Sequence, residues 1–167
     1  WYQLSKYIRI QCITSWSQDA ILIVEIGDKI FVNLNDAGLN FYSRYLKRLI
    51  KNYKESYILT LSGYGDADMI NFYGEDGKFI KRKEFSENHI GKQLSDQANI
   101  IGAKNIIPFS SFHQYQRTDT IWAQNYTVPT ELYKKGIAKN HTFIDPFILI
   151  DCEKTDYKKI NPKKLKI

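Results

Sequence analysis

The sequence predicts an α/β fold, because short apolar stretches typical of strands alternate with amphipathic stretches typical of helices. Three patterns carry this prediction: a hairpin over residues 20–34, a helix and strand over 41–61, and a second helix and strand over 86–109. The length of 167 residues fits one domain. No apolar run approaches the roughly 20 residues of a membrane-spanning helix, so no membrane partner is expected.

The N-terminal region is predicted to be a run of strands. Residues 6–14 alternate apolar and polar side chains. Residues 20–26 are rich in β-branched side chains, and Gly27-Asp28 is a two-residue turn signal before the apolar run of residues 29–34. This predicts a β-hairpin whose second strand ends at Asn35-Asp36.

Two helices are predicted, each followed by a strand. The first covers residues 41–53 and precedes a strand over 57–61; the second begins near Ser86, ends at Gly102 and precedes a strand over 104–109. Each helix has one apolar face that is expected to pack on the protein. These faces consist of Phe41, Tyr45, Leu49 and Tyr53 in the first helix, and Ile90, Leu94, Ala98 and Ile101 in the second.

The C-terminal region has weaker patterns. Residues 130–135 predict a short helix, and residues 143–150 form an apolar run that Pro146 interrupts. We expect residues 1–150 to form the domain and residues 151–167 to form a basic extension.

Basic residues outnumber acidic ones by 24 to 18, which gives a formal net charge of +6. Much of the excess lies in residues 78–83 and 158–166. Such clusters bind polyanions by releasing counterions, so a basic nucleic-acid-binding domain is one hypothesis. Because no nucleic-acid motif accompanies the charge, a solvated face is favoured and nucleic acid is not the expected partner.

The two cysteines, Cys12 and Cys152, are far apart and form neither a disulfide framework nor a CxxC metal motif. Residues 1–13 lack the uninterrupted apolar core of a secretory signal. We therefore expect a cytoplasmic protein with reduced cysteines.

Two residues follow strands at points where α/β sheets bind ligands. Asp36 ends the predicted hairpin, and its carboxylate suits a metal ion or a polar substrate group, the alternative being a turn cap ahead of Gly38. His113 follows the strand of residues 104–109 and suits a metal ligand or general base, the alternative being a hydrogen-bonded loop histidine.

No other motif completes a catalytic site. The loop SGYGDAD (62–68) matches no phosphate-binding pattern; its acidic residues suit a cation, and a flexible turn is the favoured interpretation. No HxH, HExxH or GxSxG motif occurs in the sequence.

Several short patches, in order, resemble the second half of a metallo-β-lactamase-fold protein. The hairpin ends in VNLND (32–36), a strand runs into SGYGDADMINFYG (62–74), and IIPFSSFHQYQ (106–116) precedes WAQNYTVPTEL (122–132). They are most similar to the group that contains the ascorbate-6-phosphate lactonases, the N-acylphosphatidylethanolamine phospholipases and the C-terminal domain of CMP-N-acetylneuraminate hydroxylase. The hydroxylase-like members have a V-N-x-x-D pattern, a P-F-A-G-Y-type segment after a strand, and an asparagine shortly before a proline, like Asn125 and Pro129.

The resemblance implies an αββα sandwich of two similar halves, of which this α/β chain is the second, with divalent metals (Zn, Mn or Fe) at one edge. It implies that Asp36 bridges or binds metal, and that His113 either completes the catalytic site as a metal ligand or contacts the substrate. Tyr64 and Trp122 are expected to line the substrate pocket, with Asn125 beside them in contact with the substrate.

The family's H-x-H-x-D-H ligand cluster has no counterpart in this chain, which begins at Trp1. We therefore expect an N-terminal half of the same fold upstream, against which the apolar helix and sheet faces, Ile90 and Leu94 included, would pack. A further ligand histidine usually precedes the hairpin, where this chain has Ser15-Trp16-Ser17.

The resulting hypothesis is one part of a metal-dependent hydrolase that acts on a small anionic substrate, phosphorylated or sugar-like. A dinuclear site holds two cations about 3.5–4 Å apart and needs roughly five or six donors, so the upstream half would have to contribute most of them. The alternatives are a binding module of the same fold that has lost its metals, and the nucleic-acid-binding domain.

Overall fold

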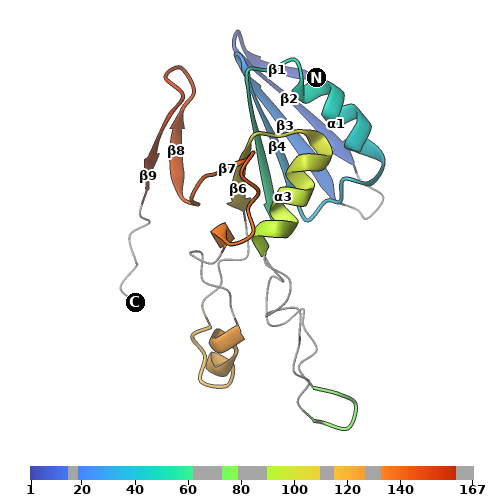
Figure 1. Ribbon diagram of the computed structural model, residues 1–167, viewed down its shortest axis with the longest axis vertical. Coiled ribbons are helices and arrows are strands. Elements are labelled where there is room, and N and C mark those ends of the chain that lie inside the picture. Colours follow the sequence, from blue (N-terminus) through green and yellow to red (C-terminus); the bar gives the residue numbers. More distant parts are fainter. Residues whose placement is uncertain (15–18, 62–72, 79–89, 110–114, 127–132, 161–167) are drawn as a thin grey trace.

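The computed structural model describes residues 1–14, 19–61, 73–78, 90–109, 115–126 and 133–160. Within these residues, seven strands form one mixed sheet and two further strands form a separate hairpin (Figure 1). The sheet strands lie side by side in their order along the chain: β1 (Tyr2–Ser5), β2 (Ile8–Thr14), β3 (Ala20–Ile26), β4 (Lys29–Asn35), β5 (Glu55–Leu61), β6 (Asn105–Phe109) and β7 (Thr142–Phe143).

The first four strands form an antiparallel meander. The predicted hairpin of residues 20–34 is confirmed, because β3 pairs with β4 from Leu22–Asn33 to Ile26–Lys29. Gly27 in the connecting turn has a left-handed φ of 59°, which glycine adopts without a steric penalty. The predicted strand of residues 6–14 is β2, and β1, which was not predicted, pairs with it at the edge of the sheet.

The remaining strands run parallel to β4, so the sheet is antiparallel on one side and parallel on the other. Helix α1 (Ser43–Ile50), preceded by the short helix η1 (Asn40–Tyr42), lies between β4 and β5 in the sequence. Helix α3 (Ile90–Ile101) precedes β6 and ends at Gly102, whose φ is 79°. The predicted alternation of strands and helices is therefore confirmed.

Helices α1 and α3 cover one face of the sheet (Figure 1). The main hydrophobic core lies between these helices and the sheet. Because successive strand residues point to opposite faces, the core takes alternate residues from β3 and β4 and Ile58 from β5. The completely buried members include Ile21, Ile23, Ile30, Val32, Ile58, Leu46 and Ile106.

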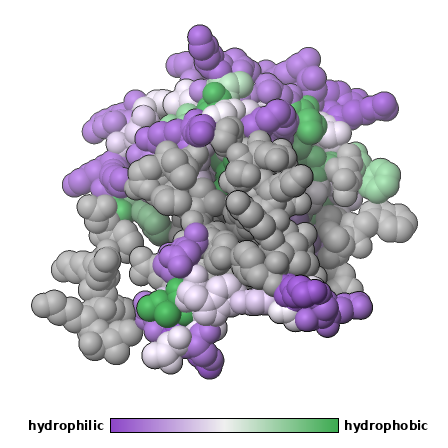
Figure 2. Space-filling view, turned by 60° about the horizontal axis from the view of Figure 1, so that its bottom comes forward, coloured by the Kyte–Doolittle hydropathy of each residue, from purple (hydrophilic) through white to green (hydrophobic). Residues whose placement is uncertain are grey.

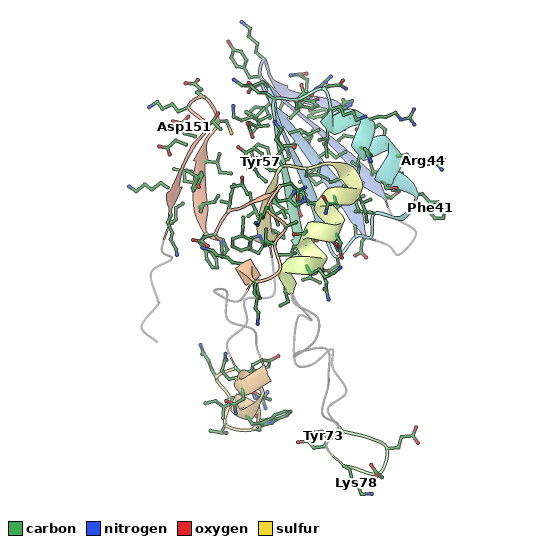
Figure 3. The ribbon with its side chains drawn as sticks, in the orientation of Figure 1. Phe41, Arg44, Tyr57, Tyr73, Lys78 and Asp151 are labelled. Carbon is green, nitrogen blue, oxygen red and sulfur yellow. The ribbon has the colours of Figure 1, made fainter. Side chains whose placement is uncertain are left out.

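The apolar face predicted for the first helix is wrong in part. Leu46 and Ile50 are the buried residues of α1, whereas Phe41 is 76% exposed and projects away from the sheet (Figure 3). Tyr45 is only partly buried and donates a hydrogen bond through its hydroxyl to Gln11 Oε1 at 2.6 Å. The pattern of one apolar residue every four positions selected residues at the rim of the helix–sheet interface. At such a rim an amphipathic ring like that of Tyr45 keeps its hydroxyl near polar partners.

The expectation that the second helix leaves its apolar face for an upstream segment is also wrong. Ile90 and Leu94 are 4% and 1% exposed, because α3 packs on the sheet of this chain. Helix–sheet packing within the 167 residues therefore satisfies this face.

The opposite face of the sheet is covered in part by the hairpin of β8 (Ile148–Asp151) and β9 (Asp156–Lys159) (Figure 1). Tyr57 lies between this hairpin and the sheet (Figure 3), and its ring stacks on Phe31 with the centroids 4.5 Å apart. The hairpin spans residue 150, the boundary that the sequence suggested between domain and basic extension.

No helix in the described part of the chain is long and apolar enough to cross a membrane.

Candidate functional site

The carboxyl ends of β4, β5 and β6 meet at one edge of the sheet. The parallel pairing aligns Asn33 with Leu59 and Leu61 with Phe109, so the three strands end within a few residues of one another. Figure 2 turns this end of the molecule forward, and its described surface is mostly hydrophilic with a few hydrophobic residues between. Ligands of open α/β sheets bind outside the carboxyl ends of such strands, which makes this edge the candidate site.

A tight turn at the end of β4 holds Asp36 at this edge. Asn35 has a φ of 45°, a left-handed conformation that asparagine tolerates better than most residues. Its N–H donates to Asn33 Oδ1 at 3.0 Å, and Ala37 N–H donates to Leu34 O at 2.7 Å. Because Leu34 and Ala37 are buried in the core, the turn is fixed and the Asp36 side chain between them is exposed.

The Asp36 carboxylate makes no hydrogen bond or ion pair with another residue that the structure describes. It is therefore an acceptor available to a ligand, and its oxygens suit a hard cation or a donor group of a substrate. The alternative role, a cap for the following turn, is not what its side chain does in this part of the chain.

Tyr64 and His113 lie outside the described residues. In the sequence, Tyr64 follows the last residue of β5 by three positions, and His113 follows the last residue of β6 by four. The topology therefore brings the two strands that lead to them to the edge that carries Asp36.

Trp122 and Asn125 lie on the short helix η3 (Ile121–Tyr126), and both are exposed. Trp122 Nε1 donates to Asp119 O at 2.9 Å, and its ring meets Tyr73 edge-on with the centroids 6.2 Å apart. No interaction between described residues joins either side chain to Asp36. Tyr73, which the sequence did not single out, is the aromatic partner of Trp122.

The described residues at this edge do not by themselves fit a metal centre. No group of three or more His, Cys, Asp or Glu side chains that could hold a metal ion occurs among the described residues. A catalytic zinc needs about three protein ligands, and Asp36 supplies one. Any cation at Asp36 would need donors from outside the described ranges.

His141 has a structural role. Its Nδ1 lies 3.0 Å from Ala103 O, and its Nε2 lies 2.9 Å from Asn99 Oδ1. These contacts join the segment before β7 to the end of α3, so both ring nitrogens have partners.

A cluster of three polar side chains, Arg9, Glu25 and Tyr53, also lies away from the edge. Arg9 Nη2 is 2.7 Å from Glu25 Oε2, and the Tyr53 hydroxyl donates to the same oxygen. Partial burial raises the pKa of Glu25, but the hydrogen bonds from Arg9 and Tyr53 outweigh it and lower that pKa below its usual value. This cluster joins β2 and β3 to the segment after α1, which is a structural role.

Comparison with known proteins finds no match to this chain among protein-family models, curated proteins or solved structures.

Proposed function

We propose that this chain is the C-terminal portion of a metallo-β-lactamase-fold protein, and that the edge at Asp36 forms part of a metal-dependent hydrolase site for a phosphorylated or sugar-like substrate. The observation that carries the proposal is the fixed turn at the end of β4. It presents the Asp36 carboxylate, which has no partner among the described residues, at the shared carboxyl edge of three parallel strands. In the family that the sequence resembles, the corresponding aspartate bridges the metals.

The arrangement of layers supports the same proposal. α1 and α3 cover one face of the sheet, and β3 has apolar residues on both faces, as in a strand that is buried on two sides. One half of an αββα sandwich has this character. The positive net charge of +6 suits an anionic substrate.

The test is the metal content of the full-length protein, purified without chelator, as wild type, Asp36→Asn and Glu153→Gln. Glu153 is an exposed carboxylate in the β8–β9 turn and serves as the matched control. We expect Asp36→Asn to lose metal and to lower hydrolysis of a chromogenic phosphate ester by at least about 100-fold, since even residues that only support a metal ligand cost 10–100-fold. Glu153→Gln should match the wild type.

An unchanged metal content in Asp36→Asn would contradict the proposal. A wild-type protein that binds no metal, and whose melting temperature does not change with chelator, would favour the metal-free binding module, because a bound cation stabilises the folded state by mass action. Binding to DNA that falls steeply with salt would favour the nucleic-acid hypothesis.

A further inference from the structure

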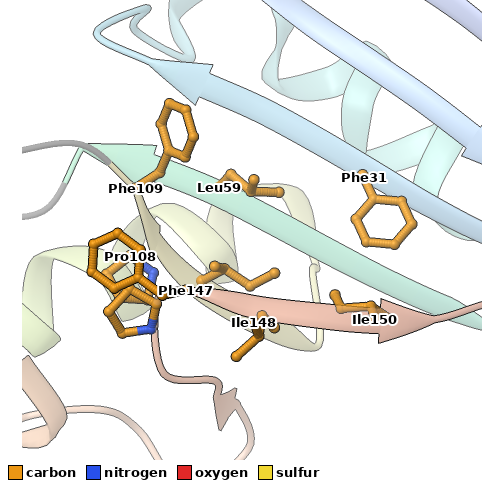
Figure 4. Close-up of a pocket in the computed structure, with 9 residues that line it drawn as sticks. Phe31, Leu59, Pro108, Phe109, Phe147, Ile148 and Ile150 are labelled. Carbon is orange, nitrogen blue, oxygen red and sulfur yellow. The ribbon is translucent and has the colours of Figure 1, made fainter. Parts of the chain in front are cut away.

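An apolar cavity of about 520 Å³ lies between the sheet and β8, on the face that the helices leave free (Figure 4). β4, β5 and β6 form its floor, and the segment that enters β8 forms its opposite wall. Its lining residues are Phe31, Leu59, Ile107, Pro108, Phe109, Pro146, Phe147, Ile148 and Ile150.

The lining favours an apolar ligand. None of these nine side chains carries a nitrogen or oxygen atom, so a hydroxyl or phosphate buried against them would lose hydrogen bonds to water and find no side-chain partner. Three of the nine are phenylalanines, whose rings bind other aromatic rings more tightly than buried area alone accounts for. The cavity therefore favours an uncharged aromatic group.

The size of the cavity indicates more than one ring. An apolar cavity of about 150 Å³, lined by similar side chains, accommodates benzene. The present cavity is more than three times larger and falls in the range of about 300–1,000 Å³ typical of small-molecule sites. A group of two fused rings fits this volume and leaves room for its attachment to a larger ligand.

The backbone at Phe147 is held in an unfavourable conformation beside the cavity. Its φ of 58° is rare for a bulky residue, and such strain is concentrated at ligand-binding and switch sites. Ile160 N–H donates to Phe147 O at 2.6 Å, which ties the base of the hairpin to this residue. Phe147 and Phe109 remain 51% and 38% exposed, so two lining aromatic rings reach the surface.

We propose that this cavity binds a planar, uncharged aromatic group of about two fused rings. Phe109 is the last residue of β6, so the bound group would lie next to the edge that carries Asp36. The proposal needs no metal, but it concerns the face of the sheet that the other half of the proposed αββα sandwich would cover. Binding of the probe by the full-length protein would therefore support the cavity and argue against a second half packed on this part of the face.

The test uses the full-length protein with naphthalene as the probe, titrated up to its solubility and followed by NMR. Ile148→Trp fills the cavity, and Leu149→Trp is the matched control, because Leu149 is the next residue of β8, points the other way and is 61% exposed. We expect Ile148→Trp to weaken binding at least tenfold and Leu149→Trp to change it less than twofold. Equal affinity of both variants, or no binding by the wild type, would overturn the proposal.

Two further measurements test whether the aromatic rings of the cavity contribute to the binding of naphthalene. Phe147→Gly removes one ring and relieves the left-handed strain, so it should bind naphthalene several-fold more weakly while it remains folded by circular dichroism. Decalin, the saturated two-ring analogue, should bind about two- to tenfold more weakly than naphthalene if aromatic contacts matter. Decalin binding as tight as naphthalene would overturn the aromatic assignment.

Discussion

The two faces of the sheet differ in how well they are covered. Along β3, Ile21 and Ile23 point to the helices and are completely buried, whereas Leu22 between them points the other way and is 37% exposed. Cys12, which pairs with Leu22 across β2 and β3, is also exposed. The helix face thus supplies most of the packing free energy, while the other face, only partly covered by β8 and β9, holds the apolar cavity. The difference separates the part of the chain that stabilises the fold from the part available to a ligand.

The largest expected effect comes from shortening a side chain on the helix face. Ile58→Ala removes a completely buried side chain from the main core and should destabilise the protein by about 2–5 kcal/mol. Leu22→Ala, on the other face, should cost about 1 kcal/mol or less, because part of that side chain is already in water. Urea unfolding of both variants measures the contrast, and equal losses would contradict it.

The second effect tests how closely α3 approaches the segment that contains Tyr133 and Lys135. A Cβ at Gly91 would collide with Lys135 O and Tyr133 O, both backbone atoms that cannot rotate away. Gly91→Ala should therefore destabilise by about 1–3 kcal/mol, although alanine favours a helix by about 1 kcal/mol over glycine. Ile100→Ala, at an exposed position of the same helix, should change the unfolding free energy by about 0.5 kcal/mol or less. A more stable Gly91→Ala would show that the approach is looser.

The third effect concerns the ion pair between Arg9 and Glu25, which lies at the edge of the helix-covered face. Because the pKa of Glu25 is lowered in the folded state, its ion pair with Arg9 stabilises the protein above the unfolded-state pKa of about 4.3 and is lost as the pH falls through the folded value. We expect Glu25→Gln to lower the unfolding free energy by about 1 kcal/mol at pH 7, since Arg9 is partly exposed. The gap to wild type should close as the pH falls through the lowered pKa of Glu25. A gap that is independent of pH would contradict the ion-pair assignment.

The smallest effect compares the two cysteines. Cys12 is exposed on the open part of the sheet, whereas Cys152, in the β8–β9 turn, is partly buried, and this burial raises its pKa despite the opposing charge of Lys29. Alkylation by iodoacetamide at pH 8 should therefore be roughly three- to tenfold faster at Cys12, because the thiolate is the reactive form. The single variants Cys12→Ser and Cys152→Ser assign the two rates. Equal rates would contradict the partial burial of Cys152.

The local elements of the fold were largely predictable. The run from Ala20 to Asn35 carries its own turn signal in Gly27-Asp28, and Gly102 ends α3 as expected. The predicted buried face of α1 is wrong in part because the sequence pattern treats Phe41, Tyr45 and Leu46 alike as apolar residues. Only the position of the helix on the sheet shows which of them is buried. Asp36 was identified because it ends a strand, but its freedom from partners among the described residues depends on the turn at Asn35.

Strands β2 to β6 and the helices α1 and α3 can be predicted from the sequence, because periodicity and turn chemistry act over a few neighbouring residues. Only the folded chain shows that β4, β5 and β6 end at one edge, and that Phe31, Phe109 and Phe147, distant in sequence, line one cavity. Such contacts follow from strand order and from where the β8–β9 hairpin packs. They depend on free energies summed over the whole core, which no local pattern records.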